Sequence, residues 1–528
     1  MFRIFNQLES SPMKNFVALV IFIFSSSLLY AQAPSIKWQK ALGGTSFDVS
    51  YGIIQSADSN FVMIGTVQSN DGDVSGNMGL YDIWVVKLSK TGTIIWQKTY
   101  GGTGSDYGAS ISQTNDGGYV IAGYTNSADG DVTGQHGKVD GWVVKISDTG
   151  ALQWQRALGG SEFDAVLSAK QTADSGYIIA GWSGSTNGDL TTNMGSEDCW
   201  VVKLTPTGAI SWMHSMGGSA EDHASSAMQT SDGGYIVAGT VKSMDFDIKG
   251  NHGASDYILY KLSSTGNLQW QECYGGTGIE ACGEHGYAGA VKQTADGGYV
   301  LSGWSNSNDG NVTGNHGNYD AWIIKVDDTG ALKWQKSLGG GGDDEANYVS
   351  IAPDGGIIIA ALSDSISGQV TGVHGLHDFW LLKLDSTGTM LWQQCYGGTD
   401  KEIAFQMEQT FDGNYIASGY TKSTGGQVSG QHGDFDAWVV YLEDPMELTH
   451  LERPARVGIF PNPATGLIRL TNVPMLSQIR IFNTQGQVVT ETFQTESISV
   501  EDFSAGLYYI CVYDGKGALV AREKLVKM

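Results

Sequence analysis

The sequence predicts an all-β fold in which seven similar four-stranded antiparallel sheets close into a ring, followed by a small β-sandwich. Three observations predict it: a tryptophan recurs at a nearly fixed interval, each repeat carries four strand-like patterns between turn signals, and the repeat stops near residue 444. The interval is 58 residues, with one of 64, and the tryptophans are Trp38, Trp96, Trp154, Trp212, Trp270, Trp334 and Trp392. A fixed period of this length indicates stacked copies of one supersecondary unit, here the blade of a seven-bladed β-propeller.

Four strands are expected in each copy, and the second copy shows them clearly. Alternating apolar residues bounded by Gly, Asn, Asp and Ser clusters are typical of short antiparallel strands. The expected strands are residues 107–114, 119–125, 140–146 and 151–158. Asn-Asp-Gly-Gly at 115–118 and Ser-Asp-Thr-Gly at 147–150 supply the glycine that tight hairpins need. A longer polar loop joins the second strand to the third.

The strand count predicts that the ring closes. Seven fourth strands carry the Trp motif and seven third strands carry an Asp-x-Trp-type motif, but only six Thr-Gly turns join them. Residues 36–42 therefore form an unpaired fourth strand at the start, and residues 436–442 an unpaired third strand at the end. Because exposed edges favour aggregation, we expect these two strands to pair and complete the seventh blade.

Composition bounds the class of protein. The chain has 528 residues with 73 Gly, 15 Trp and 23 Tyr, a mixture typical of β-repeats with many turns. Its 55 acidic and 30 basic residues give a formal charge of −25. A nucleic-acid partner is not expected, because phosphate binding relies on Lys and Arg patches. The acidity is interpreted either as a device for solubility or as a preference for cations.

The first 33 residues are typical of an export signal. Lys14 supplies a positive charge, residues 16–29 are apolar, and Ala-Gln-Ala at 31–33 offers a cleavage site. An apolar run of about 14 residues is shorter than the roughly 20 that a membrane-spanning helix needs. We therefore expect a protein that leaves the cytoplasm and has no integral membrane segment.

Five cysteines are too few and too scattered for a disulfide framework. Cys273 and Cys395 share one repeat position and are expected to be small core residues. Cys282 lies close to Cys273 in the six-residue insertion that makes the single long interval. A local bridge between Cys273 and Cys282, or two separate thiols, are the alternatives.

Two sets of acids are candidate binding residues. At the start of each first strand, an acid follows a Gly-Gly doublet by four residues. These acids form either a negative funnel for a cation or a basic ligand, or caps for the amides of their own loops. They are Asp48, Asp106, Asp164, Asp222, Glu280, Asp344 and Glu402. Glu284 and His285 in the insertion, where the repeat symmetry breaks, are added to the candidate ligand-binding residues.

Paired acids in the loop from second to third strand are candidate calcium ligands, because calcium favours several oxygen ligands from one short loop. The pairs are Asp71 with Asp73, Asp129 with Asp131, and Asp245 with Asp247. The loop lacks the third acid and the distal glutamate of an EF-hand, and no cofactor other than calcium is expected. The Gly-x-His-Gly motif of the same loop is interpreted as packing, since methionine replaces the histidine in two copies.

The aspartate that starts each third strand occurs in every copy and is expected to hydrogen-bond a neighbouring turn. These residues are Asp82, Asp140, Asp198, Asp256, Asp320, Asp378 and Asp436. No Gly-x-Ser-x-Gly, His-Glu-x-x-His or P-loop motif occurs. The leading hypothesis is therefore a non-enzymatic monomer that binds a glycan or protein on its acidic loop face. A secreted hydrolase or lyase with carboxylates at the channel mouth, and a structural surface scaffold, are the alternatives.

The last 70 or so residues carry an ordered set of motifs. Pro-Asn-Pro at Pro461, Asn462 and Pro463 is followed by Asn-x-x-Gly ending at Gly486, by Gly506 and Tyr508, and by a basic tail with Lys524 and Lys527. This set closely resembles the type A C-terminal sorting domain of the type IX secretion system (T9SS) of Bacteroidota. The repeat region is similar to secreted repeat proteins that often precede such domains.

The resemblance implies export through the outer membrane by the type IX machinery, followed by removal of the domain and release or surface attachment. The expected organisation is a signal peptide at 1–33, the propeller at 34–444, a linker at 445–456 and the sorting domain at 457–528. The expected location is extracellular or on the outer-membrane surface.

Overall fold

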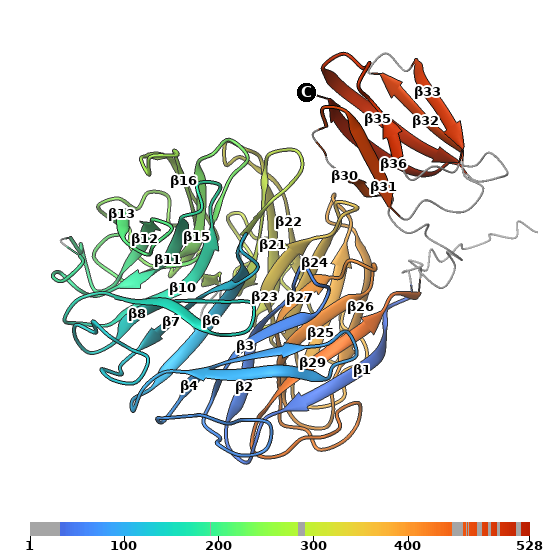
Figure 1. The fold of residues 1–528 in the computed structure, drawn as a ribbon. Helices are drawn as coiled ribbons and strands as arrows, with labels where there is room; N and C mark the ends of the chain where they lie inside the picture. The colour runs from blue at the N-terminus through green and yellow to red at the C-terminus, as the bar shows by residue number, and fades with distance from the viewer. Residues whose placement is uncertain are drawn as a thin grey trace, which may run out of the picture.

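The computed structural model describes residues 32–190, 192–282, 291–445, 458–460, 462, 464–471, 478–483, 487–493, 497–513 and 519–527. Residues 1–31 of the expected signal peptide lie outside the described residues. Among the described residues, those before residue 445 form seven antiparallel sheets (Figure 1). The all-β, seven-bladed propeller predicted from the repeat is confirmed.

Each blade is formed by strands in chain order, from the inner strand to the outer one. The first blade comprises β2 (Asp48–Gln55), β3 (Phe61–Val67), β4 (Asp82–Leu88) and β5 (Ile94–Tyr100). The second comprises β6 (Asp106–Gln113), β7 (Tyr119–Thr125), β8 (Asp140–Ile146) and β9 (Leu152–Leu158). The third comprises β10 (Asp164–Gln171), β11 (Tyr177–Ser183), β12 (Asp198–Leu204) and β13 (Ile210–Met216). The strands predicted for the second copy match these bounds to within one residue.

The remaining blades follow the same order. The fourth comprises β14 (Asp222–Gln229), β15 (Tyr235–Val241), β16 (Asp256–Leu262) and β17 (Leu268–Tyr274). The fifth has its inner strand described in two parts, β18 (Glu280–Ala281) and β19 (Val291–Gln293), followed by β20 (Tyr299–Ser305), β21 (Asp320–Val326) and β22 (Leu332–Leu338). The sixth comprises β23 (Asp344–Ile351), β24 (Ile357–Ser363), β25 (Asp378–Leu384) and β26 (Met390–Tyr396).

The seventh blade joins the two ends of the repeat region. Its strands β27 (Glu402–Gln409), β28 (Tyr415–Thr421) and β29 (Asp436–Glu443) come from the end, and β1 (Ser35–Leu42) comes from the start. Strand β1 pairs antiparallel with β29, with Gln39 opposite Val440 (Figure 1, blue beside orange). The predicted pairing of the two unpaired strands is confirmed.

Main-chain bonds also connect the blades around the ring. The amide of the first residue of each inner strand donates to a carbonyl just before the third strand of the preceding blade, as Asp106 does to Tyr81 at 2.7 Å. The equivalent bond from Asp48 to Phe435, at 2.9 Å, joins the first blade to the last. Seven isolated parallel bridges mark these positions, one for each junction. The ring is therefore closed both by strand pairing and by backbone contacts.

The core consists of seven clusters, each between two neighbouring blades. The third-strand tryptophans lie within them and are at most 1% exposed: Trp84, Trp142, Trp200, Trp322, Trp380 and Trp438. They therefore pack between neighbouring blades. The fourth-strand tryptophans pack differently, because each of the first six lies under the Thr-Gly turn of the next blade. At Gly208 (φ +81°), for example, a Cβ atom would meet the Trp154 ring at 3.1 Å.

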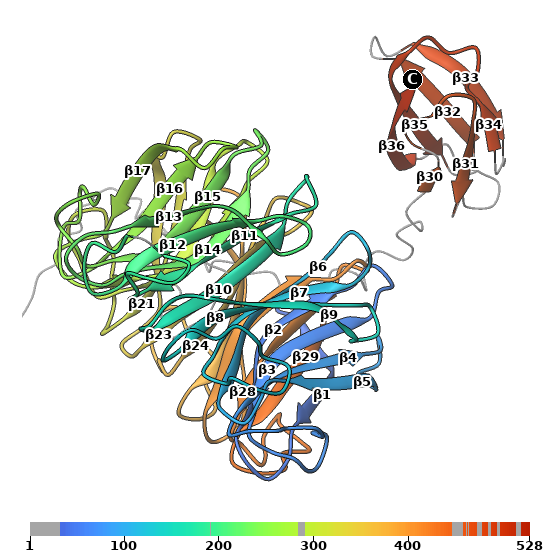
Figure 2. The same ribbon diagram turned by 60° about the vertical axis from the view of Figure 1, so that its left-hand side comes forward.

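The C-terminal residues form two further sheets (Figure 2). One contains β30 (Gly458–Phe460), β31 (Leu467–Thr471) and β34 (Ser497–Ser499). The other contains β32 (Gln478–Asn483), β33 (Val488–Phe493), β35 (Gly506–Tyr513) and β36 (Leu519–Lys527). Ile468 and Ile498 of the first sheet share one apolar cluster with Ile481 and Ile510 of the second. The predicted small antiparallel sandwich is confirmed.

Candidate functional site

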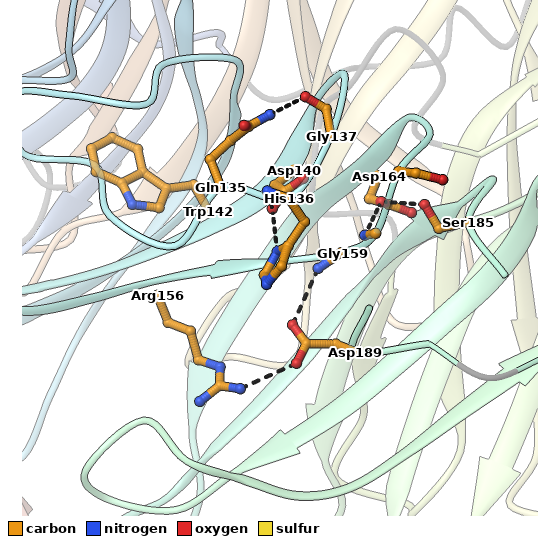
Figure 3. A network of polar contacts seen from close by, with 12 residues as sticks. Gln135, His136, Gly137, Asp140, Trp142, Arg156, Gly159, Asp164, Ser185 and Asp189 are labelled. Carbon is orange, nitrogen blue, oxygen red and sulfur yellow. Dashed lines mark hydrogen bonds and ion pairs between the residues drawn. The ribbon is translucent and has the colours of Figure 1, made fainter. Parts of the chain in front are cut away.

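The acids that follow the Gly-Gly doublets are buried within their own loops. The carboxylate of Asp164 accepts hydrogen bonds from the Gly160 amide at 2.8 Å and from the Ser185 hydroxyl at 2.7 Å (Figure 3). The same amide bond, from the second glycine of the doublet, occurs in all seven copies at 2.7–2.9 Å. All seven side chains are 0% exposed: Asp48, Asp106, Asp164, Asp222, Glu280, Asp344 and Glu402.

Each of the seven acids therefore caps an amide of its own loop, the arrangement expected from the second of the two interpretations. A Gly-Gly loop carries more N–H donors than the adjacent strands can satisfy, and a buried carboxylate meets them while being stabilised itself. A ligand-binding role for these acids stays a prediction.

The aspartates that start the third strands bind the turn before them, as predicted. Asp140 Oδ2 accepts the His136 amide at 2.9 Å and contacts His136 Nδ1 at 2.7 Å (Figure 3). Five copies have this histidine contact, and in the other two the amide comes from a methionine. The histidine is thus a hydrogen-bonding partner rather than only a packing residue, because its ring lies beside a buried carboxylate.

The second oxygen of these aspartates is buried without a hydrogen-bond partner in all seven copies. Burial raises the pKa of Asp82 to about 6, with Asp106 and Asp131 adding repulsion. Burial also raises the pKa of Asp256 to about 6, although His252 opposes the shift. These two carboxyls therefore keep their protons to a higher pH than an ordinary aspartic acid.

The paired acids of the second loop tie that loop to the Gly-Gly loop. Asp71 accepts the amide and the hydroxyl of Thr45, both at 2.9 Å, and Asp129 makes the same two bonds to Thr103. Asp245 accepts the Ser219 amide at 2.8 Å.

The second acid of a pair lies near the first glycine of the doublet. Asp73 and Asp131 accept the amides of Gly43 and Gly101, both at 3.4 Å. The Asp247 amide donates to the Gly217 carbonyl at 3.2 Å, a main-chain bond that Asp73 and Asp131 also make, to Gly43 and Gly101. Among the described residues no group of three or more His, Cys, Asp or Glu side chains is arranged to hold a metal ion. Calcium binding at these pairs stays a prediction.

The insertion in the fifth blade is described only in part. Glu284 and His285 lie outside the described residues. Cys273 and Cys282 are buried free thiols. Of the two alternatives, the structure therefore shows two separate thiols and not a bridge.

A continuous series of aromatic rings lies on the loop face, where inner strands begin and second strands end. We call it the aromatic arc: Tyr51, Phe405, Tyr420, Phe435, Phe47, Tyr81, Tyr107 and Tyr124. Successive ring centroids are 4.9–6.2 Å apart, across the seventh, first and second blades. All members except Phe405 are partly exposed. Lys422 Nζ lies 4.8 Å from the Phe435 ring centroid.

The aromatic surface continues on other blades of the same face. Trp182 stacks with His223 at 5.0 Å, and Trp304 meets Tyr319 edge-on at 4.7 Å. Phe163 is 46% exposed, with Lys138 Nζ 5.1 Å from its ring. These residues are not fixed by the repeat, so the sequence reasoning missed them. Part of the signal was present, because Phe47, Tyr81, Tyr107 and Phe435 stand directly before or after a repeated acid.

A second feature lies at the opposite ends of the inner strands. A cavity of about 280 Å³ is lined there by residues that include Lys170, Lys292, Glu408, Tyr348 and Gln406. The equivalent positions on other inner strands carry Ile54, Ser112, Met228 and Ser350. The repeat pattern does not indicate this site, because the seven copies carry different residues at these positions.

The motif residues of the C-terminal domain make specific contacts. Asn462 donates to the Lys524 carbonyl at 2.7 Å and accepts the Val526 amide at 2.9 Å, so it ties the start of the domain to β36. Tyr508 donates to the Ser504 carbonyl at 2.8 Å. Gly506 begins β35, and Lys524 and Lys527 lie in β36. Pro461, Pro463 and Gly486 lie outside the described residues.

Comparison with known proteins connects this domain to secretion. Residues 458–528 match the family described as the secretion system C-terminal sorting domain. The regulatory protein FlaEY of Caulobacter vibrioides is 26% identical over 221 residues. That match covers 36% of this chain, and the chain spans only 22% of the length of this curated relative.

Several solved structures match this chain at low similarity. PorZ of Porphyromonas gingivalis, a surface component of its type IX secretion system, has a TM-score of 0.27 at 11% identity, covering 94% of this chain and 75% of its own. Sqt1 of Chaetomium thermophilum has a TM-score of 0.40 at 11% identity, covering 78% and 100%. An α-L-arabinofuranosidase of Fusarium graminearum has a TM-score of 0.36 at 11% identity, covering 78% and 99%.

No helix among the described residues is long and apolar enough to cross a membrane. The motif set, the sandwich fold and the family match all concern the same C-terminal residues. This chain is therefore a secreted β-propeller protein with a type IX secretion system C-terminal sorting domain, destined for the cell surface or the extracellular space.

Proposed function

We propose that the propeller is a non-enzymatic binding module that recognises a glycan on its loop face, with the aromatic arc as the contact surface. The observation that carries the proposal is the continuity of the arc across three blades. Partly exposed rings provide flat apolar faces for the C–H groups of sugar rings, and the tyrosine hydroxyls add hydrogen bonds. The ligand-binding hypothesis drawn from the sequence is thereby placed on aromatic residues rather than on the buried acids.

The electrostatics of the face favour a neutral or weakly charged glycan. Tyr81 and Tyr107 are stacked at 5.3 Å, and burial raises the pKa of Tyr107, so its hydroxyl stays protonated and able to donate. Lys422, the cation over the Phe435 ring, is paired with Asp434 at 3.1 Å, so its charge is largely neutralised and gives little attraction for a polyanion.

A glycan array probed with the purified chain tests the proposal. We expect binding to at least one neutral oligosaccharide, and a loss of affinity of tenfold or more in Tyr81→Ala and Tyr107→Ala. Phe411→Ala is the matched control, because Phe411 is 70% exposed at the opposite end of the blades and should not affect binding. An array without any bound glycan, or binding that both tyrosine variants retain in full, would contradict the proposal.

The same glycans and the same purified chain distinguish a binding module from the alternative, a hydrolase or lyase. Each bound glycan is incubated with the chain, and its products are analysed by mass spectrometry. The binding module leaves the glycan intact, whereas an enzyme shortens it.

A further inference from the structure

The cavity at the far end of the channel contains an unbalanced set of charges. Lys170 on β10, Lys292 on β19 and Glu408 on β27 line it together, which gives two basic side chains and one acidic side chain in a protein whose formal charge is −25. Lys292 Nζ donates to the Tyr348 hydroxyl at 3.0 Å, and that hydroxyl lies 3.1 Å from Glu408 Oε1. The Glu408 carboxylate thus accepts a hydrogen bond from Tyr348 and forms no ion pair with Lys170 or Lys292.

The two lysine side chains lie close enough to interact directly. Burial, with the neighbouring Lys292 charge, holds the pKa of Lys170 well below its usual value. Burial also lowers the pKa of Lys292, although Glu408 opposes the shift. Burial and mutual repulsion thus disfavour charge on both lysines at once, and an anion bound between them would favour the charged form of each.

Neutral hydrogen-bonding groups complete the lining. Ser226 is 0% exposed and lines the cavity, and its hydroxyl has no hydrogen-bond partner. The Ser110 hydroxyl, on the neighbouring side of the same cavity, is also buried without a partner. The Gln406 amide donates to Glu408 Oε1 at 3.0 Å and so helps to hold that carboxylate. A buried hydroxyl without a partner is costly, which indicates that a ligand completes the site.

We propose that this cavity is a binding site for a small oxyanion, held between Lys170 and Lys292 and hydrogen-bonded by the Ser110 and Ser226 hydroxyls. The volume of about 280 Å³ suits a molecule no larger than a monosaccharide acid. Glu408 positions Lys292 through Tyr348 and excludes a second anionic group. This site shares no residue with the aromatic arc, although Phe405 of the arc directly precedes Gln406 of the cavity on β27.

Calorimetric titration of the full chain with inorganic phosphate, sulfate and D-glucuronate tests the proposal. We expect one molecule bound per chain for at least one probe, with affinity reduced tenfold or more in Lys170→Met and in Lys292→Met. The mineral anions and the sugar acid distinguish a free oxyanion from a carboxylate ligand. Methionine is the matched replacement, because Met228 already occupies the equivalent position on β14. Lys333→Met, at an exposed lysine on the outer strand of the fifth blade, should leave the affinity unchanged.

Two further measurements guard against a merely structural role. Glu408→Gln removes a repulsive carboxylate and should tighten anion binding several-fold. Titration of the unchanged chain near pH 8 in buffers of different ionisation enthalpy should show proton uptake on binding, as Lys170 becomes charged beside Lys292, Tyr348 and Glu408. The absence of binding by all three probes, or affinities that neither lysine variant changes, would overturn the proposal. Its failure would leave glycan binding on the loop face unaffected.

Discussion

The indole Nε1 of Trp142 donates a hydrogen bond to Gln155 Oε1 at 2.7 Å, between the third and fourth strands of the second blade. Four other blades contain the same pair. In three of them the glutamine follows the tryptophan by 13 residues, and in the seventh blade Trp438 donates to Gln39 from the start of the chain. Two blades break it. Met213 stands where a glutamine would accept from Trp200, and Ile258 stands where a tryptophan would donate to Gln271. Trp200 Nε1 and Gln271 Oε1 are each buried without a partner as a result.

Met213→Gln should stabilise the protein by about 1 kcal/mol, because it gives a buried N–H an acceptor with the geometry that the other blades already use. The free energy of unfolding from urea denaturation is the measurement. Trp200→Phe removes the donor, so adding Met213→Gln to it should give no such gain. An equal gain in both backgrounds would show that the Trp–Gln pair is not the source.

Removal of residues 32–42 should destabilise the propeller by more than about 3 kcal/mol, since it opens the ring and exposes β29 as a sheet edge. Trp438 would also lose its acceptor, Gln39. Thermal unfolding and light scattering would report the loss of stability and the expected aggregation. A synthetic peptide of residues 34–43 should restore part of the stability. A truncated chain as stable and monomeric as the parent would contradict ring closure through β1.

Stability should be greatest near pH 4. The pKa values of Asp82 and Asp256 are raised to about 6 by burial, so between pH 4 and 6 the folded state binds more protons than the unfolded state. The unfolding free energy therefore falls as pH rises through this range. Burial also raises the pKa of Asp116 and of Asp174. Hydrogen bonds from a threonine and a lysine outweigh this effect and lower each pKa to about 2. These groups lose their stabilising effect as pH falls from about 4 toward 2.

Urea midpoints from pH 2.5 to 8 would measure this profile. Asp256→Asn should flatten the decline above pH 4, because the amide cannot ionise. Stability that rises steadily to pH 7 would contradict the raised pKa values.

Gly208→Ala should cost about 1–2 kcal/mol, because the residue has φ +81° and its new Cβ atom would lie 3.1 Å from the Trp154 ring. The matched control is Gly425→Ala, where a Cβ atom meets nothing within 4 Å and φ is not positive. Thermal unfolding compares the two. Equal and small effects would show that the Trp-under-turn contact tolerates a methyl group.

Much of the fold followed from local pattern. The Trp interval, the Gly turns and the mismatch between seven strands and six turns predicted the blade, its four strands and the β1–β29 pairing, because each is a property of the repeat itself. The site was predicted poorly for the same reason. Asp164 was selected since it recurs, yet recurrence here reflects a structural cap that every loop needs.

The sequence alone determined the repeated architecture and the destination of the protein, because periodicity and the motifs from Asn462 to Lys527 are read along the chain. Only the tertiary structure decided which side chains meet. Tyr81 and Tyr107 meet when two neighbouring blades pack, whereas Lys170 and Lys292 come from the third and fifth blades and meet in the ring. Closure places the inner strands around one channel, so residues about 120 positions apart share a cavity whose charge no single repeat reveals.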